Sequence, residues 1–145
     1  MKQLLLLLTI VVFLFAGCEK DSSTGNVTLK YEVVSTSTFS PVFSSGIQVA
    51  PPLTVYYINE TGQQQNEQIN TNSSTWSKTI QVTATQRPLM IVFNVTAYTA
   101  SEQGTGVVRL YVNGVLKASQ NVTITPSFYQ AGKGAFTGYL NHFIY

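Results

Sequence analysis

Apolar and polar residues alternate along most of the chain after residue 26. Every second residue from Val27 to Val33 is apolar, and the residues between them are polar. This period of two places the apolar side chains on one face of a β-strand, and no window of ten or more residues has a convincing helical period. Alternation or short apolar runs predict further strands at residues 53–59, 64–70, 76–82, 89–95, 107–112, 115–124 and 136–144.

Two of these segments allow more specific expectations. Residues 89–95 are almost continuously apolar, which predicts a central strand buried on both faces. Residues 60–62, Glu-Thr-Gly, predict a turn into a polar partner strand at an exposed sheet edge. Residues 36–52 contain three prolines and are expected to form a long loop, in which Ile47–Ala50 either forms a short edge strand or does not.

The dipeptide Asn113-Gly114 predicts a hairpin between residues 107–112 and 115–124. A two-residue turn would place Leu110 opposite Lys117 and mix apolar with charged groups on both faces. A three-residue loop that pairs Tyr111 with Val115 would collect Val108, Leu110, Leu116 and Ala118 on one face. Because register follows the buried face, we expect the three-residue loop.

Seven or eight short antiparallel strands with polar turns predict an all-β fold, an immunoglobulin-like antiparallel β-sandwich. Thr, Ser, Val and aromatic residues dominate the chain after the first 17 residues, as suits a pleated, half-buried surface. The chain has one cysteine, so no disulfide joins the sheets, and any likeness to immunoglobulin domains is one of architecture. Trp76 is expected in the core between the sheets.

The N-terminus has the pattern of an export signal. Lys2 precedes a run of 12 residues, 4–15, that is apolar except for Thr9 and too short to cross a membrane. Residues 15–18, Phe-Ala-Gly-Cys, resemble a bacterial lipobox, in which the cysteine takes a diacylglyceryl group and becomes the mature N-terminus. We therefore expect a signal peptide at residues 1–17, a lipidated Cys18 with a polar linker to residue 26, and one domain at residues 27–145.

The predicted lipid determines where the protein lies. Acyl chains such as palmitate on Cys18 would tether the domain to a membrane that it does not span. The charged stretch directly after Cys18 resembles the surface-export signal of Bacteroidota lipoproteins. The expected location is the cell envelope, at the outer membrane, on either the periplasmic or the surface side.

Charge and composition exclude several classes of function. A formal net charge of +2 with 10% charged residues does not suit a protein that binds nucleic acid by neutralising phosphates. One histidine and one cysteine do not suit most metal sites, and no motif indicates a cofactor. We therefore expect no metal, no cofactor and no nucleic-acid partner.

Four segments resemble the MmpS family of small membrane-anchored β-sandwich proteins, which accompany lipid exporters. They are Val27-Thr28-Leu29-Lys30-Tyr31-Glu32-Val33, Val55-Tyr56-Tyr57-Ile58-Asn59-Glu60-Thr61-Gly62, Trp76-Ser77-Lys78-Thr79-Ile80 and the hairpin at residues 107–117. The insertion at residues 39–52 and a lipid in place of a transmembrane helix depart from that family. The resemblance implies an envelope accessory role, beside a transporter, and identifies no catalytic residue.

Catalytic chemistry has little support in the sequence. His142 is the sole imidazole, and no oriented serine and carboxylate accompany it in the sequence, so a structural role is favoured. Three of the acids, Glu60, Glu67 and Glu102, fall in or near turns, where a solvated charge is the ordinary state. We expect a protein that is not an enzyme.

The last strand carries the strongest candidate for binding. Phe136, Leu140 and Ile144 fall on one face and leave Tyr139, Phe143 and Tyr145 on the other. If the first face points inward, the other three form an exposed aromatic stripe that can stack on a sugar ring or hold a protein partner. The alternative is that the loop at residues 39–52 covers this strand on its second side. Two functions follow: an envelope accessory or scaffold protein that docks on another envelope protein, or a cell-surface module that binds a glycan or ligand.

Overall fold

The computed structural model describes residues 25–83 and 89–145 and is all-β. The predicted signal peptide, Cys18 and most of the linker lie outside the described residues. Within these residues, ten strands follow one another: β1 (Asn26–Ser35), β2 (Val42–Ser44), β3 (Ile47–Ala50), β4 (Leu53–Ile58), β5 (Gln64–Ile69), β6 (Thr75–Thr83), β7 (Leu89–Thr99), β8 (Gly104–Val112), β9 (Val115–Pro126) and β10 (Gly134–Ile144). No described helix is long and apolar enough to cross a membrane.

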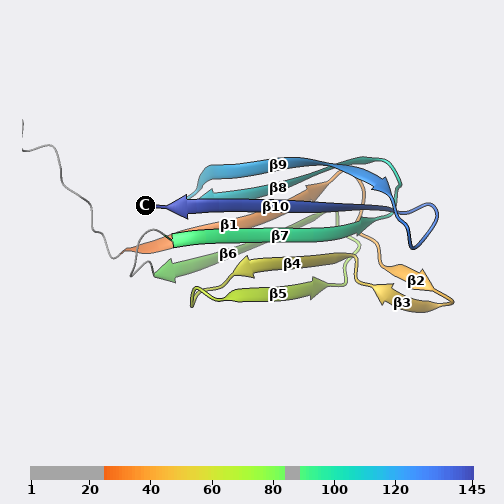
Figure 1. The fold of residues 1–145 in the computed structure, drawn as a ribbon, viewed down its shortest axis with the longest axis horizontal. Coiled ribbons are helices and arrows are strands. Elements are labelled where there is room, and N and C mark those ends of the chain that lie inside the picture. Colours follow the sequence, from red (N-terminus) through yellow and green to blue (C-terminus); the bar gives the residue numbers. More distant parts are fainter. Residues whose placement is uncertain (1–24, 84–88) are drawn as a thin grey trace, which may run out of the picture.

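Eight strands form an antiparallel sandwich with two layers (Figure 1). Sheet A has the order β6-β1-β8-β9, and sheet B has the order β10-β7-β4-β5. The layers are joined at one corner, where Gly134 pairs with Pro126 and Ala135 with Thr125. The opposite side, between β5 and β6, has no strand pairing. The predicted β-sandwich is therefore confirmed.

The connectivity resembles that of immunoglobulin domains at its centre. β1 pairs with β6 in one sheet and β4 pairs with β7 in the other, as the B–E and C–F pairs do in that fold. The hairpin β8–β9 lies on the other side of β1. β2 and β3 form a separate hairpin, so Ile47–Ala50 is a strand, but it pairs with β2 and not with either sheet.

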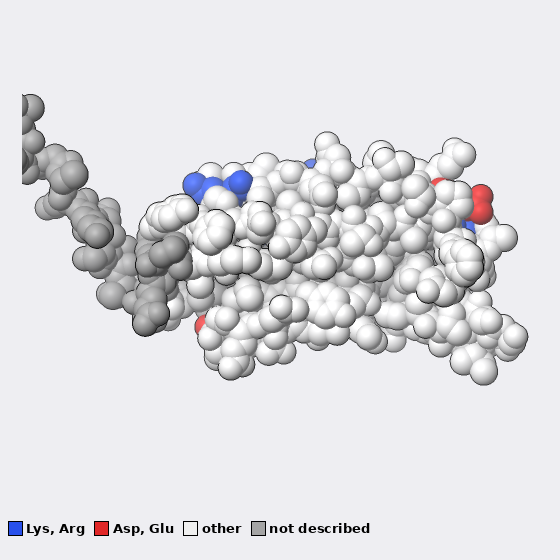
Figure 2. Space-filling model, viewed as in Figure 1, with Lys and Arg blue, Asp and Glu red and all other residues white. Residues whose placement is uncertain are grey.

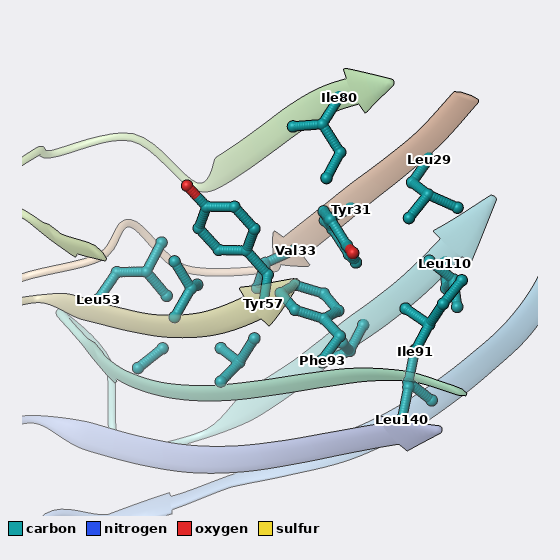
Figure 3. Packing of buried hydrophobic residues seen from close by; sticks show 14 of the residues in the cluster. Leu29, Tyr31, Val33, Leu53, Tyr57, Ile80, Ile91, Phe93, Leu110 and Leu140 are labelled. Atoms are coloured by element: carbon teal, nitrogen blue, oxygen red, sulfur yellow. The ribbon is translucent and has the colours of Figure 1, made fainter. Parts of the chain in front are cut away.

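The core fills the space between the sheets (Figure 3). Tyr31 on β1 and Phe93 on β7 face each other with ring centroids 5.0 Å apart, and both are fully buried. Burial raises the pKa of Tyr31, whose hydroxyl donates a hydrogen bond to the Ile58 carbonyl at 3.1 Å. Trp76 is partly buried and stacks on Phe93 at 6.0 Å, which agrees with its predicted place in the core.

The expectation for residues 89–95 is half right. β7 is central in sheet B, with β4 on one side and β10 on the other. It is not buried on both faces, however, because its residues alternate between buried and partly exposed, and Met90 is exposed. The outward apolar residues belong to a sheet face that no second layer covers, so the continuous apolar run was misleading.

The register prediction for the β8–β9 hairpin is wrong. Val112 pairs with Val115 across a two-residue turn, in which Asn113 and Gly114 both have positive φ, +49° and +78°. The register then shifts, so that Tyr111 pairs with Leu116 and Leu110 with Ala118. This bulge restores the apolar pairing that a plain two-residue hairpin would lose. Ala118 reaches the inner face as predicted, whereas Leu116 stays outside.

The two ends of the sandwich differ in what they contain. The end at which β1 begins is called the N-terminal end; it also contains the Asn113-Gly114 turn and the last residues of β10 (Figure 1). The far end holds the β2–β3 hairpin and the β9–β10 loop, residues 127–133. A hydrogen bond from the Phe43 N–H to Gln130 Oε1 at 3.3 Å joins these two segments.

Candidate functional site

The last strand presents its aromatic residues outward as its alternation indicates. Phe136 and Leu140 are 5% and 7% exposed, whereas Tyr139 is 47%, Phe143 46% and Tyr145 83% exposed. The alternative, in which the loop at residues 39–52 covers this side of the strand, is wrong, because that segment forms the β2–β3 hairpin at the far end. Whether the exposed aromatic residues bind anything stays a prediction.

Tyr139 belongs to a row that crosses sheet B. It pairs with Asn94 on β7, Asn94 pairs with Tyr56 on β4, and Tyr56 pairs with Asn66 on β5. Paired residues of antiparallel strands point to the same face, about 5 Å apart. The row therefore alternates aromatic and amide side chains over roughly 14 Å, which is three strand spacings. Its residues come from four segments and cannot be recognised as neighbours without the register.

The outer face of sheet B has no charged residue among those that the structure describes. We call it the uncharged face; its outward residues are Ala135, Thr137, Tyr139, Asn141, Phe143, Met90, Val92, Asn94, Thr96, Tyr98, Thr54, Tyr56, Ile58, Gln64, Asn66 and Gln68. Figure 2 shows this side of the molecule white across its centre, with the charged residues in view at its margins. Desolvating such a surface costs less than desolvating a charged one, because no full charge has to leave water.

Two features hold β10 in this position, where it leaves β9 after the corner. Gly138 lies against Val108 of β8, and a Cβ atom at this glycine would collide with the Val108 side chain. Gln120 of β9 accepts a hydrogen bond from the Tyr139 N–H at 2.6 Å through Oε1. A side chain thus replaces the backbone partner that the diverging strand β9 no longer supplies.

The structure divides the predicted stripe into two parts. Tyr139 lies in the middle of the uncharged face, whereas Phe143, at the margin of that face, and Tyr145 line an open groove of about 480 Å³ at the N-terminal end. His142 and Lys117 also line this groove, together with residues of the Asn113-Gly114 turn. The ring centroids of Phe143 and Tyr145 are 6.3 Å apart. A surface at the middle of the sheet and a groove at its end are therefore separate candidates.

The outer face of sheet A carries a charged cluster that sequence reasoning missed. Glu32 accepts hydrogen bonds from Lys30 Nζ at 2.8 Å, from Arg109 Nη1 at 2.8 Å and from the Tyr111 hydroxyl at 3.2 Å. The bonds from Lys30 and then Arg109 hold the pKa of Glu32 below its ordinary value. The bond to Glu32 raises the pKa of Lys30 and that of Arg109. In the sequence, the members of the cluster are two residues apart in each strand, Lys30 and Glu32 on β1 and Arg109 and Tyr111 on β8. Only the β1–β8 register brings these two pairs together.

A second ion pair lies at the side between β5 and β6. Lys78 Nζ is 3.0 Å from Glu67 Oε2 and 4.8 Å from the centroid of the Tyr57 ring. Tyr57, and then Glu67, raise the pKa of Lys78. Because β5 and β6 share no backbone ladder, this ion pair joins them directly, and Trp76 of β6 packs against Tyr57 of the neighbouring strand β4.

The residues weighed for catalysis do not come together. His142 is at the N-terminal end, paired with Ile91, whereas Glu102 is at the far end and accepts a hydrogen bond from the Gly132 N–H at 2.9 Å. Among residues 25–83 and 89–145, no group of three or more His, Cys, Asp or Glu could hold a metal ion. The part of the chain in view thus offers a binding surface and a groove as its candidate sites.

Neither a family model nor a curated protein matches the chain.

Proposed function

We propose that this protein is a lipid-anchored envelope protein without enzymatic activity, which docks on another envelope protein through the uncharged face. The observation that carries the proposal is that face itself: four paired strands whose outward residues are aromatic, aliphatic, amide or hydroxyl. Protein interfaces are depleted of charge at their centre and enriched in tyrosine. Tyr139, about half exposed at the middle of the face, is the expected anchor residue.

The size of the face indicates a weak contact. β7 presents outward residues from Met90 to Tyr98, a length of roughly 27 Å, and the four strands add a width of roughly 14–19 Å. The resulting area of roughly 400–500 Å² per partner belongs to transient interfaces. A lipid on Cys18 would compensate for weak affinity, because confinement to the partner's membrane raises the effective concentration.

The lipobox-like segment at residues 15–18 and the four MmpS-like segments support this proposal. In the structure those segments fall on β1, on β4 with its following turn, on β6 and on the β8–β9 hairpin. The resemblance favours a partner that is itself a membrane protein, such as a transporter. The membrane is the outer membrane, with the domain on its periplasmic or surface side.

The proposal is tested with the chain as it is made in the cell and with a Cys18→Ala variant that cannot take the lipid. The protein is crosslinked in intact cells, the envelope is solubilised, and captured proteins are identified by mass spectrometry. We expect one integral-membrane protein in stoichiometric amount with the lipidated chain. The variant should keep its melting temperature and lose the capture. If the untethered variant captured the same membrane protein in undiminished amount, the proposal would be contradicted.

A second function is favoured by the row Tyr139, Asn94, Tyr56 and Asn66. Aromatic rings stack on the faces of sugar rings, and amides bond to sugar hydroxyls, so this row also fits a glycan. In that case Tyr139→Ala should abolish retention on a polysaccharide matrix without lowering the melting temperature, while protein capture by the wild-type chain should be absent.

A further inference from the structure

The N-terminal end of the sandwich is apolar and exposed where β8 turns into β9. Val115 is 55% and Leu116 49% exposed, directly after the Asn113-Gly114 turn. Across the groove stand the exposed rings of Phe143 and Tyr145. Aliphatic and aromatic side chains thus gather at this end of the molecule, on two segments that are distant in sequence.

The point where the chain enters the domain is tied to the same turn. The Asn113 N–H donates a hydrogen bond to the Thr28 carbonyl at 2.8 Å, and the Thr28 N–H donates one to Asn113 Oδ1 at 2.9 Å. The Asn113-Gly114 turn, which Val115 and Leu116 follow, is therefore fixed beside the first residues of β1. Whatever holds the chain ahead of β1 holds this turn close by.

The covalent reach of the chain is short. Cys18 and Gly25 are seven peptide steps apart, which span at most about 25 Å. β10 has 11 residues and extends for about 37 Å, so the far end lies that much farther from the beginning of β1. With a lipid on Cys18, the N-terminal end is the part of the sandwich that is held next to the bilayer.

The charges around the groove suit a bilayer surface. Lys117 lines the groove, and none of the described residues that line it is acidic. Glu60, in the β4–β5 turn at this end, has β7 between it and β10. Aromatic rings favour the boundary between headgroups and acyl chains, and a lysine can reach lipid phosphates while its stem stays in apolar surroundings.

We propose that the N-terminal end is a membrane-binding site, in which Val115, Leu116 and Phe143 enter the headgroup boundary and Lys117 pairs with lipid phosphate. This inference rests on the proposed lipid at Cys18. It places the sandwich end-on, with its strands roughly perpendicular to the plane of the bilayer. Apart from Phe143 at its margin, the uncharged face then lies outside the membrane and not against it. Tyr139 then remains accessible to a partner embedded in the same membrane.

The test uses the full lipidated chain in vesicles of phosphatidylethanolamine with a minority of phosphatidylglycerol and of nitroxide-bearing lipid. Cys18 is the chain's one cysteine, and its sulfur is blocked once the lipid is attached. Single variants Val115→Cys, Phe143→Cys, Tyr139→Cys and Phe128→Cys can therefore each carry one environment-sensitive fluorophore. Phe128, 96% exposed at the far end, and Tyr139, on the face, are the matched controls.

We expect the nitroxide lipid to quench more than half of the emission at positions 115 and 143 and to leave positions 139 and 128 unchanged. Adding Lys117→Glu should reduce the quenching at position 143, whereas Lys133→Glu at the far end should not. Quenching at position 139 equal to that at 115 would mean a sandwich lying flat and would overturn the proposal. So would quenching at position 128, or none at 115.

Failure of the anchor is recognised separately. If the unsubstituted chain takes the fluorophore, Cys18 has a free thiol, and the proposed lipid anchor itself is wrong. If the unsubstituted chain takes no fluorophore and the label at position 115 is still not quenched, the lipid anchor is retained and the proposed end-on orientation is wrong.

Discussion

The two outer faces of the sandwich are built on the same scaffold and have opposite chemistry. Sheet A presents Glu32 with three polar partners, among serine, threonine and asparagine residues and the valine pair Val34 and Val107. Sheet B presents aromatic and aliphatic residues beside amides, and no charge. Both faces exist because each strand turns one side to the shared core, which leaves the other side free to vary. The difference is the reason why we propose the outer face of sheet B as the one that meets a partner.

The largest expected effect comes from a charge placed in the uncharged face. Asn94 lies between Tyr56 and Tyr139 in the row, so Asn94→Lys would bury an ammonium group against the partner. An unpaired buried charge costs about 3–5 kcal/mol, which reduces partner capture more than tenfold. The matched control is Asn121→Lys on the outer face of sheet A. Capture is measured as moles of partner per mole of protein. If both variants lost capture equally, the two faces would not differ in partner binding.

The next effect concerns the packing that both faces share. Gly138→Ala places a methyl group against Val108, which forces β10 away from β8. Overpacking of this kind lowers the free energy of unfolding by about 1–3 kcal/mol. Thr137→Ala, one residue earlier and pointing outward, should change it by less than about 0.5 kcal/mol. Urea unfolding followed by circular dichroism measures both, and an unchanged midpoint for Gly138→Ala would show that the strands can separate at no cost.

Removing the central ring should affect binding more than stability. Tyr139→Ala deletes a side chain that is about half exposed, so most of its effect belongs to the complex. We expect a loss of affinity of about 1–2 kcal/mol, as for an aromatic anchor. Tyr111→Ala on sheet A should instead leave partner capture intact and weaken the hydrogen bonding of Glu32. A large fall in melting temperature for Tyr139→Ala would identify it as a core residue.

The smallest effect comes from the charged cluster, and it depends on pH. Because the pKa of Glu32 is lower in the folded chain than its ordinary 4.5, the ionised carboxylate stabilises the fold above that value. This contribution is lost as the pH falls through the lowered pKa. Glu32→Gln should cost about 1 kcal/mol or less at neutral pH, since the side chains of Lys30 and Arg109 keep 40% and 33% of their surface in water, which screens the ion pairs. Melting curves of both chains should converge on acidification; a constant difference would contradict this account.

Local sequence patterns predicted where most strands lie, but not which strands pair with one another. The alternation in β10 correctly separated Phe136 and Leu140 from Tyr139 and Phe143, because burial in a two-layer sandwich acts on every second residue. Ile47–Ala50 was recognised as a possible strand, yet its partner β2 was not. The turn at Asn113 was recognised, yet the bulge after it was not, because a bulge and a longer loop both bring Ala118 to the inner face.

The candidate surfaces needed the register between distant segments. Glu32 and Arg109 are 77 residues apart, and the row of Tyr139, Asn94, Tyr56 and Asn66 comes from four strands. A sequence indicates which face a residue takes, but not which neighbour it meets there. The groove beside Lys117 was missed for the same reason, since it joins a turn to the end of the chain.

The central claim is that the uncharged face meets the partner. Its most direct test places a photo-crosslinking amino acid at Tyr139 and, as a control on sheet A, at Ser119 of the lipidated protein, and irradiates intact cells. The account predicts one crosslinked envelope protein from position 139, none from position 119, and loss of the product when Asn94→Lys is added. The same product from position 119, or a product at 139 that survives Asn94→Lys, would contradict it.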